Sequence, residues 1–120
     1  MRFMMIRRSD AVSESGQLPN PEIFAAIDQY TEAMSKAGVL VGGEGLKPSA
    51  QGARVKFNRG TPAVFDGPFT ETKELIAGYF IIEVKSKQEA IEWARRWPAI
   101  AGDENVELEL RPFYEASDFA

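Results

Sequence analysis

The sequence has 120 residues, a length that fits one domain with its own hydrophobic core. It contains no cysteine and no histidine, which excludes a disulfide framework, thiolate chemistry, and the most usual general base and metal ligand. Its formal net charge of -4 argues against a nucleic-acid-binding protein, which normally carries a basic patch.

The N-terminal segment predicts a buried strand. Phe3 to Ile6 form a continuous apolar run between Arg2 and Arg7, which is typical of a strand covered on both faces. The run is too short for a signal peptide or a membrane span. We therefore expect a soluble cytoplasmic protein with a single domain over residues 1–120.

The next element is a helix over about residues 21–37. Residues 9–17 are polar and predict a loop. Asn20 is a suitable N-cap, Pro21 fits the first helical position, and Gly38 stands where helices commonly end. Apolar residues at three- and four-residue steps give this helix one buried stripe: Ile23, Ile27, Tyr30, Met34 and Ala37.

A glycine-rich strand and an inserted hairpin follow. Residues 39–41 begin a strand that is interrupted by Gly42, Gly43 and Gly45, which indicates a bulge or another group that approaches the backbone closely. Two short runs on either side of a turn, 54–57 and 63–65, predict the hairpin.

The last predicted elements are a strand, a helix and a strand. Residues 77–84 are the most apolar strand candidate. Ser86 and Glu89 form a capping box at the start of the second helix, and Pro98 ends it. In residues 106–111 apolar and charged residues alternate, which is typical of an edge strand with one exposed face.

This order of elements predicts an α+β fold. It is the split β-α-β plan of ferredoxin-like domains, with an inserted hairpin. Right-handed crossovers place both helices on one face of the sheet. The opposite face would present Tyr79 and Ile81, which are too apolar to face water. We expect a second copy of the chain to cover it in a homodimer; the alternative is that the hairpin folds over it in a monomer.

One stretch resembles a known family signature. Asp66-Gly67-Pro68-Phe69, followed by Glu71, Lys73, Glu74 and Gly78-Tyr79, is similar to the DGPF signature of the YCII-related proteins. Residues 38–46, 90–98 and 109–113 also resemble segments of that family. The resemblance implies a ferredoxin-like, dimeric α/β-barrel fold, similar to small monooxygenases and muconolactone isomerases. For the DGPF branch it also implies a link to extracytoplasmic-function sigma factors.

Asp66 has two interpretations. As a functional carboxylate it would act as a base, or orient a ligand at the mouth of a cavity. As a structural residue it would accept hydrogen bonds from backbone N–H groups near Phe69 or Thr70. Thr70 is also expected to cap a helical turn over residues 71–74. A histidine-aspartate pair is proposed as an active site in one branch of the wider family, and this chain has no histidine to form it.

Arg7 and Arg8 end the first strand, so their side chains should point to opposite faces. An inward Arg7 would suit a carboxylate or phosphate ligand. The alternative is a solvated strand end, or an ion pair with Asp10 or Glu109.

Three further residues are candidates for the site. Glu44 lies among glycines that leave room for a ligand, so it is either a general base or an exposed turn acid. Tyr79 would line a pocket, or belong to the core or the dimer interface. Lys73 would reach Asp66 or a ligand, or be a solvated charge. We expect no metal site and no cofactor, since the usual ligands and the calcium-loop spacing are lacking.

The leading hypothesis is a homodimer that binds a small organic ligand between the sheet, the glycine-rich strand and the Asp66 turn. The ligand would be anionic if an arginine holds it, and cofactor-free enzymatic activity is left open. The predicted ligand-binding residues are Arg7, Tyr79, Lys73, Gly67, Pro68 and Phe69, with Asp66 and Glu44 as catalytic candidates. The alternative is a regulatory or protein-interaction module of a sigma-factor system, which an exposed apolar patch outside the dimer face would favour.

Overall fold

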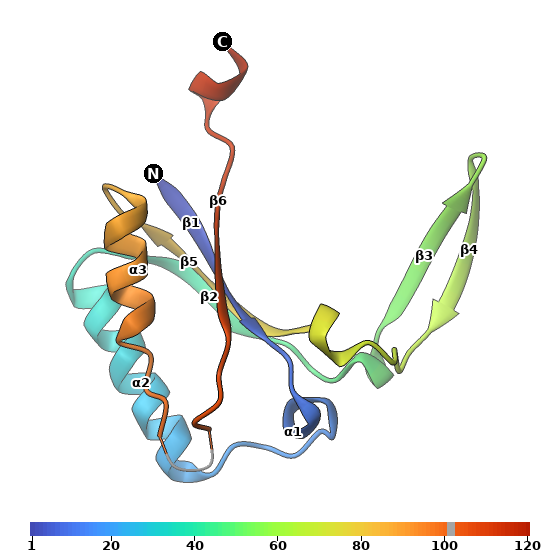
Figure 1. The fold of residues 1–120 in the computed structure, drawn as a ribbon, viewed down its shortest axis with the longest axis horizontal. Helices are drawn as coiled ribbons and strands as arrows, with labels where there is room; N and C mark the ends of the chain where they lie inside the picture. The colour runs from blue at the N-terminus through green and yellow to red at the C-terminus, as the bar shows by residue number, and fades with distance from the viewer. Residues whose placement is uncertain (101–102) are drawn as a thin grey trace.

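A computed structural model describes residues 1–100 and 103–120, with the side chain of Lys73 left out (Figure 1). The strands are β1 (Arg2–Arg8), β2 (Leu40–Gly45), β3 (Ala53–Asn58), β4 (Thr61–Asp66), β5 (Ile76–Glu83) and β6 (Leu108–Pro112). The helices are α1 (Ala11–Glu14), α2 (Pro21–Lys36) and α3 (Lys87–Arg95), and the 3-10 turns are η1 (Ser49–Gln51), η2 (Thr72–Glu74) and η3 (Ala116–Phe119). No helix in these ranges is long and apolar enough to cross a membrane.

The main sheet has four antiparallel strands in the order β2-β5-β1-β6. This is the split β-α-β arrangement, so the predicted ferredoxin-like α+β fold is confirmed. The two most apolar strands, β1 and β5, lie in the centre, and the alternating strand β6 lies at an edge, as the sequence pattern predicts.

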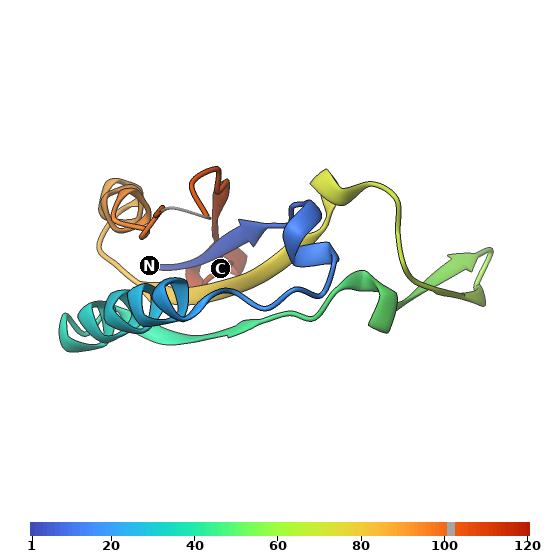
Figure 2. The ribbon, with the colours of Figure 1, turned by 90° about the horizontal axis from the view of Figure 1, so that it is seen from below.

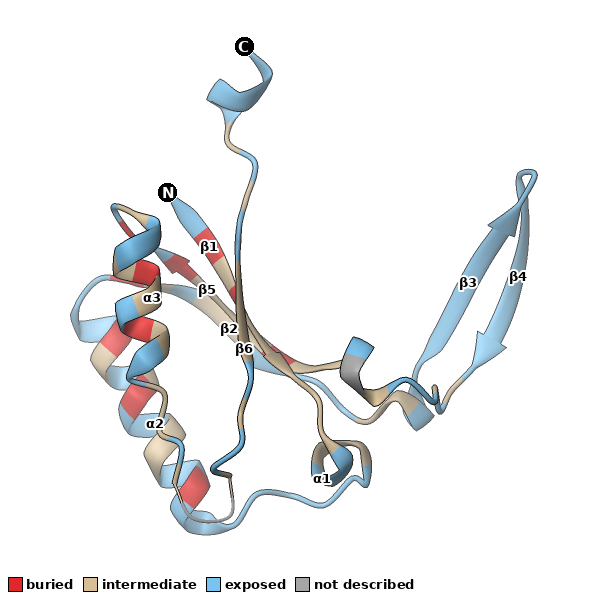
Figure 3. Ribbon diagram, viewed as in Figure 1, coloured by how far each residue is buried: buried red, intermediate tan, exposed pale blue. Residues whose placement is uncertain are grey.

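The core lies between one face of the sheet and the two long helices, α2 and α3 (Figures 1 and 3). Phe3 of β1 pairs directly with Ile82 of β5, and both are almost fully buried. The hydroxyl of Tyr30 in α2 donates a 2.6 Å hydrogen bond to the carbonyl oxygen of Trp93 in α3, which joins the two helices. The buried cluster consists of Phe3, Met5, Tyr30, Met34, Val39, Ile82, Val84, Ala90 and Trp93.

Both long helices begin at the caps that the sequence predicts. The Asn20 side chain accepts a 2.9 Å hydrogen bond from the N–H of Ile23, and Gly38 follows α2 with a positive φ of 73°. At α3, the Ser86 hydroxyl accepts from the N–H of Glu89 at 3.1 Å. The Glu89 carboxylate accepts in turn from the N–H of Lys85, one residue before the cap.

Two local predictions are wrong. Residues 9–17 were expected to form a loop, but they contain α1, because Asp10 and Ser13 cap each other's backbone N–H groups in a reciprocal box. Thr70 was expected to cap a turn over residues 71–74. The turn is a 3-10 helix instead, it is preceded by Glu71, and no side chain caps it.

The inserted hairpin, β3 and β4, extends away from the sheet (Figures 1 and 2). We call residues 53–66 the arm. All twelve residues of its strands are exposed, and these strands make their extensive contacts with each other. The alternative in which the hairpin folds over the helix-free face is therefore wrong. The result is a flat molecule with extents of 46 × 45 × 18 Å.

Candidate functional site

The signature turn is anchored by a chain of hydrogen bonds that starts at Glu14. The Ser49 N–H donates to one carboxylate oxygen of Glu14 at 2.9 Å, and the Ser49 hydroxyl donates to the other at 2.6 Å. The N–H of Phe69 then donates to Ser49 Oγ at 3.0 Å. We call Glu14, Ser49 and Phe69 the signature clamp. It joins α1, η1 and the signature turn, which are far apart in the sequence.

Gly67 is the point of closest approach in this turn. A Cβ atom at this position would overlap the carbonyl oxygen of Ser49. Only glycine therefore allows the two backbone segments at Gly67 and Ser49 to pack this closely. The Gly67 N–H donates to the carbonyl oxygen of Gly52 at 3.0 Å, and the Gly67-Pro68 peptide is cis. The signature glycine therefore fixes the base of the arm.

The aromatic residue of the signature completes the base of the arm. The guanidinium carbon of Arg54 in β3 lies 3.8 Å from the centroid of the Phe69 ring, a cation–π distance. The signature therefore holds both arm strands: β4 runs directly into it, and β3 contacts it through Arg54.

The Asp66 carboxylate does not stabilise this turn by hydrogen bonding. It is exposed and has no hydrogen-bond or ion-pair partner among the described residues. The Phe69 N–H, one of the donors that a structural Asp66 was expected to satisfy, bonds to Ser49 instead. A ligand-orienting or catalytic role for Asp66 remains a prediction.

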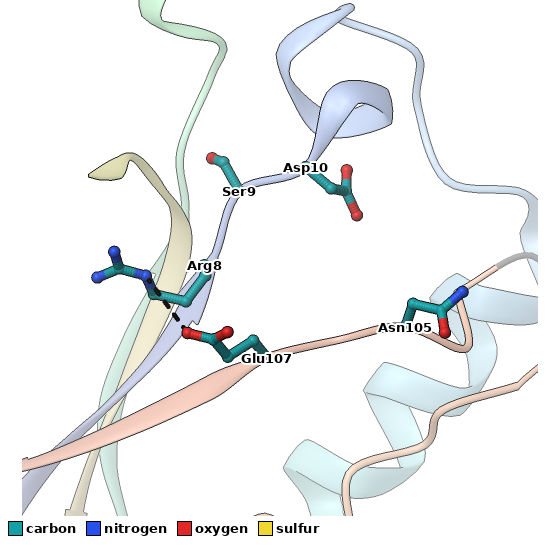
Figure 4. Close-up of a pocket in the computed structure, with 5 residues that line it drawn as sticks. All are labelled: Arg8, Ser9, Asp10, Asn105 and Glu107. Atoms are coloured by element: carbon teal, nitrogen blue, oxygen red, sulfur yellow. Dashed lines mark ion pairs between the residues drawn. The ribbon is translucent and has the colours of Figure 1, made fainter. Parts of the chain in front are cut away.

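A cavity of about 360 Å³ lies at the end of β1 (Figure 4). Polar residues line it: Arg8, Ser9, Asp10, Asn105 and Glu107. Backbone hydrogen bonds fix its walls, since the Arg8 N–H donates to the Glu107 carbonyl oxygen and the Ser9 N–H donates to that of Leu75, both at 3.0 Å. Among the described residues, no group of three or more potential ligands is placed to hold a metal ion.

The two arginines at the end of β1 bind separate sets of carboxylates. Arg8 lies 3.3 Å from a carboxylate oxygen of Glu109 and 3.9 Å from one of Glu107. Arg7 lies 2.7 Å from a carboxylate oxygen of Asp103 and 3.4 Å from one of Asp10. These contacts match the ion-pair alternative for both arginines, and the cavity is lined by Arg8 rather than Arg7.

One of the two acids of the cavity wall, Asp10, is held in its ionised form. Burial acts to raise the pKa of Asp10, but the hydrogen bonds from Ser13 and the charge of Arg7 outweigh that effect. The pKa of Asp10 is therefore lowered from its usual value of 3.8. The cavity therefore presents the ionised Asp10 carboxylate close to the Arg8 guanidinium, together with the Ser9 hydroxyl, the Asn105 amide and the Glu107 side chain.

No other predicted site residue with a described side chain lines this cavity. Glu44 of β2 pairs directly with Tyr79 of β5 on the helix-free face, and Glu44 is exposed. A Cβ on Gly43 would lie 2.6 Å from the Tyr79 carbonyl oxygen, which confirms the predicted close backbone approach. Gly67, Pro68 and Phe69 lie at the base of the arm, and their ligand-binding role remains a prediction. The side chain of Lys73 lies outside the described part of the structure.

Sequence reasoning missed part of the cavity wall. Strand alternation at Arg7 and Arg8 showed that one arginine points to each face, but not which face carries the cavity. Ser9, Asn105 and Glu107 gave no local signal, because Asn105 and Glu107 lie in an irregular segment that only the β1–β6 pairing brings to Arg8. The clamp residues Glu14 and Ser49 also gave no local signal, because they lie 35 positions apart in the sequence.

Comparisons with known proteins agree with the fold. The structure of a 5-chloro-2-hydroxyhydroquinone dehydrochlorinase from Burkholderia phenoliruptrix AC1100, in complex with 2,5-dihydroxybenzoquinone, superposes with a TM-score of 0.53. The alignment covers 98% of both chains at 15% sequence identity, so the likeness concerns the fold.

A relative and a family also match the sequence. An uncharacterised protein of Rhizobium meliloti (strain 1021) is 38% identical over 74 residues, which is 62% of this chain and only 56% of that protein. The YCII-related domain matches residues 1–114, which is nearly the whole chain. With its DGPF turn and ferredoxin-like sheet, the chain belongs to the YCII-related family.

Proposed function

We propose that the chain forms a homodimer that binds a small polar organic molecule in the cavity beside Arg8. The observation that carries this proposal is the convergence of five polar residues around one space of about 360 Å³. That size falls within the range of small-molecule sites. The short helix α1 connects the cavity to the signature turn. Asp10 of the cavity wall caps α1, and Glu14 of α1 belongs to the signature clamp.

The charges of the cavity favour a ligand with both donors and acceptors. Arg8, Ser9 and Asn105 supply donors, whereas Asp10 and Glu107 supply acceptors. The Glu107 carboxylate is 79% exposed and 3.9 Å from Arg8, so an anionic ligand group can replace it at the guanidinium with little cost. An arginine fork is well suited to such a group. Acid–base roles for Asp66 and Glu44 remain separate predictions.

The homodimer is supported by the shape of the single chain. Its accessible surface is 8530 Å², whereas a compact monomer of this mass exposes about 6,500 Å². Its radius of gyration is 16.3 Å, compared with about 14 Å for a compact domain of this length. On the helix-free face four apolar side chains form a half-buried row: Met4, Ile6, Tyr79 and Ile81. A second copy packed on this row would remove apolar surface from water.

Ligand binding is tested by titration of the protein with 2,5-dihydroxybenzoquinone and with a panel of small carboxylates, followed by amide NMR shifts. We expect saturable shifts at Ser9, Asp10 and Asn105. Arg8→Gln should weaken the binding by about tenfold or more, because a charged hydrogen-bond donor is lost. The matched control is Arg111→Gln, which removes a 71% exposed arginine outside the cavity wall. Absence of saturable shifts with every probe would contradict the proposal.

Sedimentation equilibrium tests the homodimer. The wild type should sediment at twice the mass of one chain, and Ile6→Glu should give monomers because it places a charge in the apolar row. A wild type that stays monomeric at high concentration would contradict this part of the proposal.

A second candidate function is supported by the arm. Val55, Phe57 and Val64 are exposed outside the helix-free face, which is the kind of patch that favours a protein-interaction module. A regulatory role beside a sigma factor would use such a patch. Recovery of a stoichiometric foreign partner by the wild type, but not by Phe57→Ser, would favour this function.

A further inference from the structure

The arm has two chemically different faces. Val55 pairs with Val64, and Phe57 pairs with Pro62, so these four side chains share one face. The other face carries Arg54 and Lys56, with the Lys56 ammonium 5.4 Å from the centroid of the Phe65 ring. On the apolar face, Val55, Phe57 and Val64 are 53%, 70% and 69% exposed. The arm is therefore an amphipathic ribbon whose apolar side is uncovered.

No other described segment of its own chain covers that apolar side. The arm extends beyond the sheet in both views (Figures 1 and 2), and burial is concentrated in the sheet and long helices (Figure 3). An isolated two-stranded hairpin is marginally stable in water. The arm is held at its base by the Gly67–Gly52 hydrogen bond and the Arg54–Phe69 contact. An ordered ribbon of this kind gains stability when its apolar face is buried.

The charge of the arm is opposite to that of the remaining chain. The arm contains Arg54, Lys56 and Arg59 against Asp66, so it carries a net charge of +2. We call the remaining residues, 1–52 and 67–120, the body. Because the whole chain has a net charge of -4, the body carries a net charge of -6. None of the three arm cations forms an ion pair with a described residue. The chain thus contains a cationic arm that extends away from an anionic body and forms no ion pair with the described residues of that body.

We propose that the arm docks on the body of a second copy of this chain, in a reciprocal exchange. The inference rests on the homodimer proposed above and extends it. In a two-fold dimer each chain donates one arm and receives one, so both apolar faces are covered and each cationic arm lies close to an anionic body. The receiving surface is the rim of the partner's helix-free face, next to the apolar row. Glu44 stands at this rim, exposed and without an ion-pair partner among the described residues.

Site-specific crosslinking tests this contact. Because the chain has no native cysteine, a thiol-reactive label attaches only at the introduced cysteine. Phe57→Cys is labelled with a benzophenone maleimide and irradiated as purified protein. We expect a covalent dimer, with crosslinked peptides from the partner's β2 region. The matched control is Leu18→Cys with the same label, because Leu18 is 79% exposed but lies in the loop before α2. It should give little covalent dimer.

Dimer affinity provides the second measurement. Phe57→Ser should raise the dimer dissociation constant by about tenfold or more, as removal of an aromatic anchor does. Leu18→Ser should leave it unchanged. A monomeric wild type would refute the homodimer and the arm exchange together. A dimeric wild type without crosslinks at residue 57, and with unchanged affinity in Phe57→Ser, would refute the arm exchange alone and leave the apolar face to a foreign partner.

Discussion

Replacement of Ser49 by alanine should loosen the signature turn and lower the stability of the whole domain. The Ser49 hydroxyl donates to the Glu14 carboxylate at 2.6 Å and accepts from the Phe69 N–H at 3.0 Å. The first is a hydrogen bond to a charged group, which contributes about 1.5 to 3 kcal/mol, and the second contributes about 1 kcal/mol. Both are only partly buried, so we expect a loss of about 2 kcal/mol in the free energy of unfolding.

Urea unfolding followed by circular dichroism measures this loss. With a slope of about 2 kcal/mol per molar, the midpoint should fall by about 1 M urea. Hydrogen exchange locates the effect, since the amide of Phe69 should lose its protection in Ser49→Ala. Ser35→Ala is the matched control, because that exposed serine in α2 makes no side-chain hydrogen bond within the described residues. An unchanged midpoint together with a protected Phe69 amide would refute the clamp.

Three other substitutions test separate parts of the structure. Gly67→Ala should cost about 2 kcal/mol or more in urea unfolding, because its Cβ overlaps the Ser49 carbonyl oxygen; a wild-type midpoint would show that the turn adapts freely. Asp66→Asn should change the same free energy by less than about 0.5 kcal/mol, since the carboxylate is exposed and unpartnered among the described residues; a larger loss would return Asp66 to a structural role. Burial, partly offset by Arg96, raises the pKa of Tyr30 from 10.0 to about 12, so the stability it contributes is complete below pH 10 and is lost between pH 10 and 12. Tyr30→Phe should be less stable by about 1 kcal/mol at neutral pH, and the wild-type advantage should shrink across that window; a constant difference would contradict the assignment.

The sequence predicts the regular elements well because each has a local physical cause. The caps at Asn20 and Ser86 satisfy N–H groups within their own helix. Alternation along residues 78–84 separates the buried face from the half-buried one, and the structure has Ile82 and Val84 in the core with Tyr79 and Ile81 on the other side. The sheet order follows from short connections and right-handed crossovers.

The candidate site was less predictable because its residues meet only through tertiary structure. Glu14, Ser49 and Phe69 are separated by 35 and 20 positions, so no spacing rule connects them. The signature was recognisable as a pattern, but its mechanical role depends on how closely Gly67 approaches Ser49. Local reasoning offered the nearby Asp66 as one possible acceptor for N–H groups near Phe69 or Thr70, whereas a hydroxyl from a distant segment accepts from the Phe69 N–H.

The two edge strands of the sheet also limit how copies of the chain can associate. An exposed edge normally invites another strand, and proteins resist this with bulges, charges and proline. The register of β2 shifts between Leu40 and Gly42, and β6 places Glu109 and Arg111 beside Pro112 at its end. Both edge strands therefore disfavour the edge-to-edge pairing between molecules that leads to fibres. Association through the helix-free face or the arm is compatible with these edges, whereas a continuous sheet between molecules is disfavoured.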